Sequence, residues 1–376
     1  MPTLPLFRIT RTLPALVLSL CACVPALASP EYALNFLPTG FSASAINNGG
    51  QVVGTYDGAA AILGSGGITS LASVAPGSYG LGISDNGAVA GAFDSPQSGA
   101  AFLYRGGTLT EISPLLGDAY PLSNARAIND SGVAVGIAYP FAGDAVRGYV
   151  YENGGVRLIP TFGGSWSNAL SVNASGAVTG TASIAPIDND VMDLERHAYI
   201  DRAGVIQDLG TLGGLRSEGY DINDAGSVVG WSNAAGPTDA SLAHPFLYRD
   251  GAMRDLGSLG GDAGYARALN NLGLVVGESA LGGGGSHAFL YLDGQLLDLN
   301  TLVSGAGGWE LVNAYDINDA GQILGHACQA GACVDVRLDL VPAVPEPGAW
   351  ALLLGGLPWV LRRRAGRLAA GGHHRH

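Results

Sequence analysis

The chain contains no lysine. All 18 of its basic residues are arginine, and charged residues of both signs make up only 13% of its 376 positions. The absence of lysine excludes a Walker-type phosphate loop and Schiff-base catalysis, because both need a lysine amine. No His-Glu-x-x-His sequence occurs either, which removes the helical zinc-protease motif from consideration.

Basic residues are scarce in the body of the chain. Seven of the 18 arginines lie near the two ends, so residues 30–344 carry 11 Arg against 30 acidic residues. This excess of negative charge repels phosphate backbones, and we expect no nucleic-acid partner. It is compatible with divalent cations, with a cationic partner, or simply with solubility outside the cell.

Cysteine is also rare, with four in the whole chain. Cys21 and Cys23 lie in the N-terminal segment, which leaves only Cys328 and Cys333 in the body. A zinc site would need more ligands than these two. In an oxidising compartment the pair is predicted to form a disulfide across a hairpin or loop.

Residues 1–28 have the three-part pattern of a secretory signal peptide. Two arginines precede an apolar stretch, and Ala26 and Ala28 stand at an A-x-A cleavage site. We predict cleavage after Ala28. A lipoprotein signal that ends at Cys23 is the alternative, but Cys21 fits that pattern poorly. Signal peptidase is therefore an expected processing partner.

The C-terminal end carries three features in a fixed order. Pro345, Glu346 and Pro347 are followed by a 14-residue apolar run, residues 348–361, and then by Arg362, Arg363 and Arg364. The run is shorter than the ~20 residues that usually span a bilayer, but the arginines indicate a stop with its positive charge on the cytoplasmic side.

This order over residues 342–364 resembles the PEP-CTERM sorting signal of Gram-negative bacteria. The resemblance implies an inner-membrane-anchored precursor, recognition by an exosortase, removal of the tail, and release to the cell surface or extracellular matrix. Membrane contact is then expected only through the C-terminal helix before processing. Residues 365–376 extend beyond the usual end of such a signal, and they end in a His-rich sequence.

A repeat of about 45 residues fills the region between the two ends. Its most regular element reads Ile-Asn-x-x-Gly-x-Val-Val-Gly and occurs seven times. The Asn position is held by Asn47, Ser84, Asn129, Asn173, Asn223, Asn270 and Asn318. A glycine follows three residues later in every copy, and a second glycine ends the apolar run. Asn can cap its own turn and Gly supplies a positive φ, so each copy predicts a β-hairpin.

Each repeat contains four short strands that are apolar on both faces, which is typical of a propeller blade packed between two others. We predict an all-β fold over residues 30–341, a seven-bladed β-propeller of four-stranded antiparallel blades. Residues 34–37 resemble the strand that the last repeat lacks, so this N-terminal strand is expected to complete the last blade and close the ring. Six or eight blades, or an open solenoid, are the alternatives.

The chain resembles the HAF-repeat family of extracellular bacterial proteins over roughly residues 32–340. The matching segments are His287-Ala288-Phe289, residues 208–214 and residues 221–226. Such proteins often carry the PEP-CTERM tail. The resemblance brings no catalytic residues with it, so none is assigned here.

The connections after Val-Val-Gly vary in length and should lie together on one face, where binding usually resides. The longest of them contains Asp188, Asp190, Asp193 and Glu195. This cluster is either a solvated loop or a cation-assisted binding site, so calcium is the one cofactor left open and none is otherwise expected.

We expect an exported, non-catalytic surface or matrix protein that binds polysaccharide or another surface protein through the variable loops. The alternative is a glycan-active enzyme, a hydrolase or lyase, with carboxylates near the propeller axis.

Overall fold

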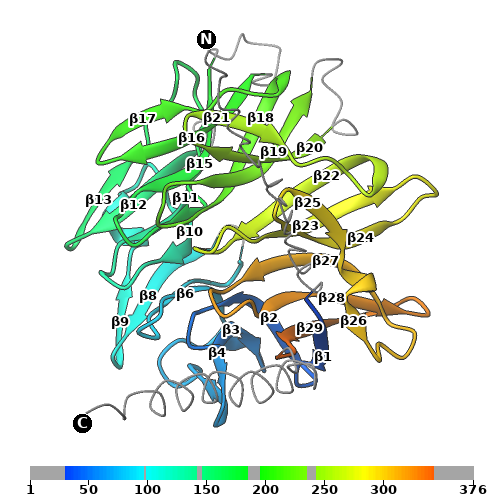
Figure 1. The fold of residues 1–376 in the computed structure, drawn as a ribbon. Helices are drawn as coiled ribbons and strands as arrows, with labels where there is room; N and C mark the ends of the chain where they lie inside the picture. The colour runs from blue at the N-terminus through cyan, green and yellow to red at the C-terminus, as the bar shows by residue number, and fades with distance from the viewer. Residues whose placement is uncertain (1–29, 97–98, 142–145, 185–194, 235–242, 343–376) are drawn as a thin grey trace, which may run out of the picture.

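The computed structural model describes residues 30–96, 99–141, 146–184, 195–234 and 243–342 (Figure 1). The predicted signal peptide, the Pro345–Pro347 motif and the arginine stop Arg362–Arg364 lie outside these residues. Within the described ranges, no helix is long and apolar enough to cross a membrane.

The described chain is all-β, and its sheets are arranged as a β-propeller (Figure 1). Two short 3-10 helices, η1 (Ser113–Leu116) and η3 (Leu299–Thr301), lie between strands. Sequential antiparallel pairing within each sheet follows from the short turns of the repeat, because a tight turn returns the chain beside the strand it has just left.

Three sheets have four strands each. The first consists of β2 (Phe41–Ile46), β3 (Val52–Tyr56), β4 (Ala59–Gly64) and β5 (Gly67–Ser70). The second consists of β6 (Ser78–Ile83), β7 (Val89–Phe93), β8 (Ala100–Arg105) and β9 (Thr108–Glu111). The third consists of β10 (Leu122–Ile128), β11 (Ala134–Tyr139), β12 (Arg147–Glu152) and β13 (Gly155–Leu158).

Two groups of four strands form a larger sheet. One group is β14 (Ser171–Val172), β15 (Val178–Ser183), β16 (Arg196–Arg202) and β17 (Val205–Asp208). The other is β18 (Gly213–Ile222), β19 (Val228–Ala234), β20 (Ala243–Arg249) and β21 (Ala252–Asp255). The two groups join through a single parallel pair, Arg196 with Arg216.

The remaining strands form two sheets. One is β22 (Gly260–Leu269), β23 (Val275–Leu281), β24 (Ser286–Leu292) and β25 (Gln295–Asp298). The other runs in the order β26 (Val303–Ser304), β1 (Tyr32–Phe36), β29 (Ala332–Leu340), β28 (Ile323–Gln329) and β27 (Glu310–Ile317).

The Ile-Asn-x-x-Gly turns have the predicted geometry. In the first, Asn47 accepts the N–H of Gln51 on its Oδ1 (2.9 Å), and Gly50 has φ +74°. The equivalent glycine has positive φ in every copy, which a residue with a Cβ rarely adopts. These glycines are Gly50, Gly87, Gly132, Gly176, Gly226, Gly273 and Gly321. The turn chemistry read from the sequence is therefore confirmed.

The glycine that ends each Val-Val-Gly run is required for a different reason. A Cβ on Gly230 would lie 1.8 Å from the carbonyl oxygen of Glu218, and one on Gly54 would lie 2.0 Å from that of Ser42. The same clash occurs in all the other copies, where the neighbouring inner strand approaches closely. Glycine is required here by contact between backbones, which the spacing alone does not reveal.

The core lies between neighbouring sheets, as two-sided apolar strands predict. Val53 of the first sheet packs in one cluster with Phe102 of the second, and Val276 packs with Leu290 and Ile323 across the last two. Val52 of the first sheet also shares a cluster with Leu324 of the last. Each sheet therefore buries both of its faces against neighbours.

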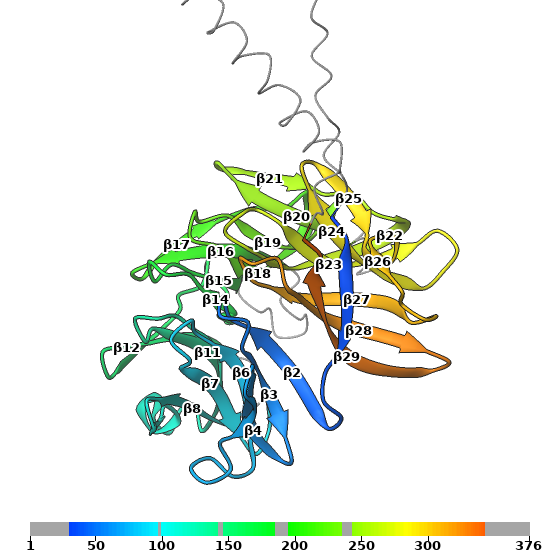
Figure 2. The ribbon, with the colours of Figure 1, turned by 60° about the horizontal axis from the view of Figure 1, so that its bottom comes forward.

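Strand β1 joins the two ends of the domain (Figure 2). It pairs antiparallel with β29 over five residues, from Tyr32 opposite Leu340 to Phe36 opposite Val336. This pairing covers the edge that β29 would otherwise expose. Nearby, Cys328 and Cys333 face each other across β28 and β29 and form a disulfide with a Cα–Cα distance of 4.1 Å.

Replacement of Tyr32 tests how much the N-terminal strand β1 contributes to the stability of the fold. The side chain is 1% exposed and belongs to the apolar cluster of the last two sheets. We expect Tyr32→Ala to lower the free energy of unfolding by about 3 kcal/mol, the typical loss for a buried aromatic side chain. Chemical denaturation of the full chain measures it. Val205→Ala, at a position 75% exposed, should change the value by no more than about 0.5 kcal/mol; equal effects would show that β1 contributes nothing particular.

Candidate functional site

A polar cavity of about 290 Å³ lies at the centre of the propeller. Residues from all seven Ile-Asn copies line it, including Ile46, Asn129 and Asn318. Because every repeat contributes, the cavity lies on the common axis. Ser171 and Asp221 also reach it.

Hydrogen bonds between the asparagines hold the repeats around this cavity. The side-chain amide Nδ2 of one asparagine donates to the backbone carbonyl at the equivalent position of the next copy. These bonds run from Asn47 to Ser84 (3.0 Å), Asn129 to Asn173 (2.9 Å), Asn173 to Asn223 (3.0 Å), Asn223 to Asn270 (3.1 Å), Asn270 to Asn318 (3.0 Å) and Asn318 to Asn47 (2.9 Å). We call this set the asparagine relay. Ser84 is too short to take part as a donor, and Asn86 bonds Asp130 instead.

The next residue of each turn adds an outer layer of contacts. The backbone N–H of Asn48 donates to Asp85 (2.7 Å), and that of Asn271 donates to Asp319 (2.8 Å). These carboxylates are therefore used in joining one turn to the next. In the described part of the chain, no group of three or more His, Cys, Asp or Glu is placed to hold a metal ion.

Two aspartates stand immediately before the Ile-Asn pair, Asp221 and Asp316. The other five copies have Ala45, Gly82, Ala127, Ser171 and Ala268 at this position. Asp221 accepts hydrogen bonds from the hydroxyl of Ser171 (2.6 Å) and from the backbone N–H of Leu269 in the next copy (2.9 Å). Asp316 accepts the N–H of Ile46 (2.7 Å), which again belongs to the next copy.

The two carboxyl groups differ in pKa from ordinary aspartates. Burial raises the pKa of Asp221, although its hydrogen bonds oppose the rise. For Asp316, burial and the nearby charge of Asp221 raise the pKa to about 7, against the lowering effect of the Ile46 N–H. Asp316 is therefore partly protonated near neutral pH.

These two residues were missed as a pair by the sequence analysis, which treated Asp221 only as part of the repeat motif. The signal was available in the repeat itself, because an ionisable residue stands where five other copies have small ones. What the sequence could not give is that two copies so far apart along the chain meet on one axis.

The His position of the HAF segment is paired with the Asp-Leu strand in three copies. His197 Nδ1 lies 2.8 Å from Asp208, and His244 Nδ1 lies 2.6 Å from Asp255. His287 Nδ1 lies 2.7 Å from Asp298. Each carboxylate partner lies on the adjacent strand of the same sheet.

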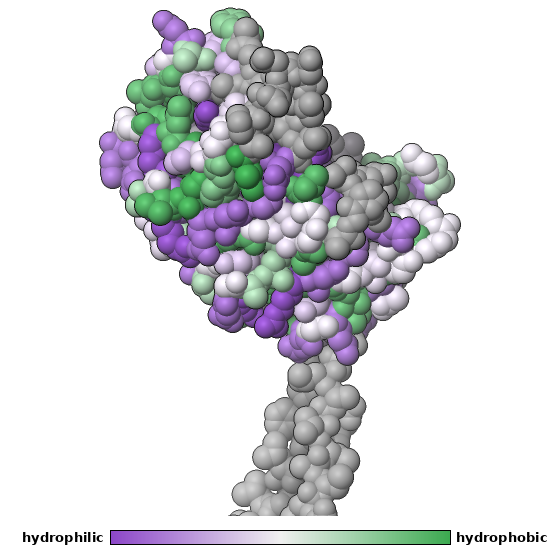
Figure 3. All heavy atoms as spheres, turned by 90° about the horizontal axis from the view of Figure 1, so that it is seen from above, coloured by the Kyte–Doolittle hydropathy of each residue, from purple (hydrophilic) through white to green (hydrophobic). Residues whose placement is uncertain are grey.

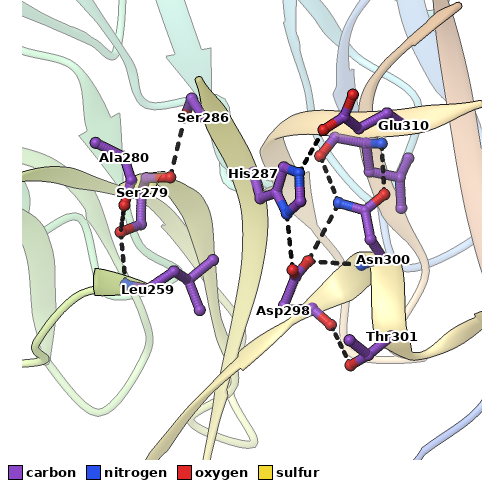
Figure 4. Close-up of polar contacts among 10 residues, drawn as sticks. Leu259, Ser279, Ala280, Ser286, His287, Asp298, Asn300, Thr301 and Glu310 are labelled. Atoms are coloured by element: carbon purple, nitrogen blue, oxygen red, sulfur yellow. Dashed lines mark hydrogen bonds and ion pairs between the residues drawn. The ribbon is translucent and has the colours of Figure 1, made fainter. Parts of the chain in front are cut away.

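His287 has a second carboxylate partner (Figure 4). Its Nδ1 bonds Asp298 and its Nε2 bonds Glu310, the first residue of β27 in the next sheet. An imidazole that donates from both nitrogens is protonated. Burial lowers the pKa of His287, but the two carboxylates outweigh this effect and raise it above its usual value.

A cluster of aromatic and charged side chains lies on β18, β19, β22 and β23. Arg267 makes paired hydrogen bonds to Glu278 (2.5 and 3.2 Å) and lies 4.9 Å and 5.0 Å from the ring centroids of Tyr220 and Tyr265. Trp231 Nε1 donates to Glu218 (3.1 Å). In the view from above, hydrophilic and hydrophobic residues are interleaved over the described surface (Figure 3).

The predicted binding loop is described only at its end. Asp188, Asp190 and Asp193 lie outside the described residues. Glu195 is partly buried next to β16, and its backbone carbonyl accepts the N–H of Ile184 (3.1 Å). A calcium site in this loop therefore stays a prediction.

No protein-family model matches the chain, and no curated protein matches it in sequence. Solved structures do resemble it in fold. A gluconolactonase from Xanthomonas campestris, XC5397, is 15% identical, with 83% of this chain and 97% of that chain covered and a TM-score of 0.38. YCF48 bound to D1 peptide is 13% identical, with 84% and 97% covered and a TM-score of 0.49. The PQQ-bound aldose sugar dehydrogenase from Streptomyces coelicolor is 9% identical, with 83% and 100% covered and a TM-score of 0.37.

The expectation that the chain is not an enzyme is wrong by this comparison. The solved structures that it resembles include a gluconolactonase and an aldose sugar dehydrogenase, and the latter is bound to a cofactor. At such identities and TM-scores these likenesses assign no particular activity to this chain.

The double partnership of His287 predicts a pH-dependent contribution to stability. Because the folded-state pKa is raised above the usual value of about 6.5, the contribution is fully present below that pH and is lost as the pH rises through the folded pKa. We expect His287→Gln to lower the free energy of unfolding by about 1 kcal/mol at pH 5 and by less at pH 9. Denaturant titrations of both proteins over this range measure the difference; a difference that is constant with pH would contradict the assignment.

Proposed function

We propose that the chain is an exported glycan-active enzyme, a glycoside hydrolase whose acid–base pair is Asp316 and Asp221. One observation carries the proposal: two enclosed carboxyl groups at equivalent positions of two repeats, Asp221 lining the axial cavity and Asp316 with its pKa raised to about 7. Pairs of titratable groups whose environments separate their pKa values are typical of acid–base sites.

We assign the transferable proton to Asp316, whose pKa is about 7, and the role of base to Asp221, which lines the cavity. Asp316 donates its proton to the leaving oxygen as the bond from the anomeric carbon to that oxygen breaks. Asp221 takes a proton from a water molecule, whose oxygen forms the new bond to the anomeric carbon. The net reaction consumes one water. Proton transfer from Asp221 back to Asp316 through solvent then restores the pair.

The hydrogen bonds around Asp221 suit the role of a base. The Ser171 hydroxyl and the Leu269 N–H hold one oxygen each, which fixes the carboxylate at the cavity. Such fixed groups need no reorganisation during reaction. Since five repeats have no carboxyl group at this position, the aspartates are not required by the geometry of the turn.

The cavity suits a small polar substrate. Its volume of about 290 Å³ is near the lower end for ligand pockets, roughly 300 Å³, and could admit a sugar unit. Its lining is rich in amide and carboxylate groups, which are suited to bonding sugar hydroxyls.

We further propose that the four-strand groups form seven blades in a closed ring. The eight-stranded sheet then counts as two blades, because one residue pair joins its halves. Two contacts between the chain ends support closure: the pairing of β1 with β29, and the bond from Asn318 to Asn47.

Export is part of the same proposal. The signal peptide at residues 1–28 and the PEP-CTERM resemblance at residues 342–364 favour processing by signal peptidase and exosortase, in a Gram-negative host. The enzyme would then meet polysaccharide at the cell surface or outside it.

A glycan hydrolysis screen of the purified full chain tests the activity. We expect turnover of at least one glycan, and a loss of about 100-fold or more in kcat for Asp316→Asn and for Asp221→Asn, because each removes one partner of the proton transfer. Activity should fall as the pH rises above about 7, where Asp316 loses its proton.

Asp94→Asn is the matched control. Asp94 is exposed and has φ +60°, a conformation that Asn tolerates, so this variant should retain full activity. Absence of turnover on every glycan, or full turnover by Asp316→Asn, would overturn the proposal.

A further inference from the structure

A second cavity, of about 590 Å³, lies where the first and last repeats meet. Its lining includes Asn35, Phe36, Gln51, Gln322 and Arg337. We call it the seam cavity. Its volume lies within the usual range of ligand pockets, roughly 300–1,000 Å³, and exceeds the 290 Å³ of the axial cavity. The seam cavity therefore has room for a ligand of its own.

One turn separates the seam cavity from the axial cavity. In the first Ile-Asn copy, Asn48 lines the axial cavity and the next residue, Gly49, lines the seam cavity. The last copy reaches the same turn, since a Cβ added to Gly50 would lie 2.8 Å from Oε1 of Gln322. A chain-like ligand that leaves the axial cavity across this turn therefore enters the seam cavity.

The glutamines of the seam cavity are specific to this junction. Gln51 and Gln322 stand four residues after the Asn position of the first and last copies. Between the third and fourth copies, Val133 and Ala177 hold this position and line a separate cavity of about 240 Å³. Joining two repeats thus does not need an amide here. The remaining copies have Ala88, Ser227 and Leu274.

The lining is polar but carries little net charge. None of the described residues that line the seam cavity is Asp or Glu, although residues 30–344 contain 30 acids. Its one charged side chain, Arg337, donates from Nη2 to Asp339 (2.8 Å). Asp339 also accepts from Asn35 Nδ2 (2.9 Å) and Gln322 Nε2 (2.7 Å). One carboxylate therefore neutralises the arginine and fixes two of the amides, which favours a neutral ligand.

The remaining groups of the lining match the two surfaces of a sugar ring. Within the described chain, Gln51 Nε2 and Asn35 Oδ1 make no hydrogen bond, so one donor and one acceptor remain for hydroxyl groups. The ring of Phe36 is 52% exposed and packs at 62° against Trp309, with 5.1 Å between the ring centroids. An exposed aromatic ring offers an apolar surface to the C–H face of a sugar.

We propose that the seam cavity binds neutral sugar units of a polysaccharide whose chain also reaches the axial cavity. The choice of a glycan as ligand rests on the proposed function, and the seam cavity extends that function to a polymeric, uncharged substrate. Gln51 and Asn35 bind hydroxyl groups, and Phe36 packs against a sugar ring.

Calorimetry on full-length Asp316→Asn measures binding without turnover. The probes are cellohexaose, maltohexaose and mannohexaose, each with its disaccharide, and the hexamer of galacturonate with its dimer. We expect at least one neutral hexasaccharide to bind about tenfold or more tightly than its disaccharide, because only the longer chain spans both cavities. The galacturonate hexamer should show a smaller advantage over its dimer.

Gln51→Ala, added to this protein, should reduce the advantage of the neutral hexasaccharide about tenfold, since a hydrogen-bond donor is lost. The variant should fold, because the fourth copy has Ala177 at the equivalent position and still forms its asparagine bond. Phe36→Leu should also reduce the advantage, and Phe36→Tyr, which keeps the ring, should retain it. Gln295→Ala is the matched control, at an exposed position of β25, and should retain the advantage.

Three results would overturn the inference: no neutral hexasaccharide that binds better than its disaccharide, an advantage that survives both Gln51→Ala and Phe36→Leu, or a larger advantage for the galacturonate hexamer. If Asp316-dependent hydrolysis accompanies any of these, the proposed function stands and this inference fails. If the advantage depends on Gln51 and Phe36 but wild type hydrolyses no glycan, the seam cavity is a binding site and the proposed function fails.

Discussion

The asparagine relay is the interaction on which the rest of the structure depends. Each asparagine serves two purposes, because its Oδ1 fixes its own turn while its Nδ2 reaches the carbonyl of the next copy. Local turn geometry and the spacing between sheets are thereby set by one side chain. The relay also fixes the residue before it, which is small in five copies and carboxylic in Asp221 and Asp316. Of the residues at that position, Ser171 and Asp221 line the axial cavity.

The carboxyl groups near the axis and those on the outer strands have different surroundings. On the outer strands, carboxylates such as Asp208 and Asp298 meet imidazole, and in the outer layer of the turns Asp85 accepts backbone N–H groups. For Asp208, burial acts to raise the pKa, but the bonds from His197 and from the Gly210 N–H outweigh it and lower the pKa. At the axis, enclosure and mutual repulsion keep one proton on Asp316. The difference makes Asp221 and Asp316 chemically distinct in a chain that is otherwise rich in acid groups.

The sequence was informative wherever the chemistry is local. Residue types and their spacing predict the positive φ of glycines such as Gly50 and the strands that are apolar on both faces. They also predict the pairing of the N-terminal strand β1 with the last repeat. The second glycine, Gly230 and its equivalents, was seen but not explained, because it depends on an approach between backbones. Asp221 and Asp316 were missed as a pair because they stand in two copies that are far apart along the chain. The non-catalytic expectation rested on the lack of contiguous catalytic motifs, which says nothing of residues that a fold gathers from separate repeats.

The central claim is that Asp221 and Asp316 act as an acid–base pair in which Asp316 is the proton donor near neutral pH. Carbon-13 NMR of the aspartate carboxyl groups measures this directly, with Asp316→Asn used to assign the signal. The account predicts one carboxyl that titrates at about pH 7 and is missing in the variant, and an Asp221 whose pKa falls when its partner is replaced. A spectrum in which every aspartate is ionised by about pH 5, near the ordinary range, would contradict it.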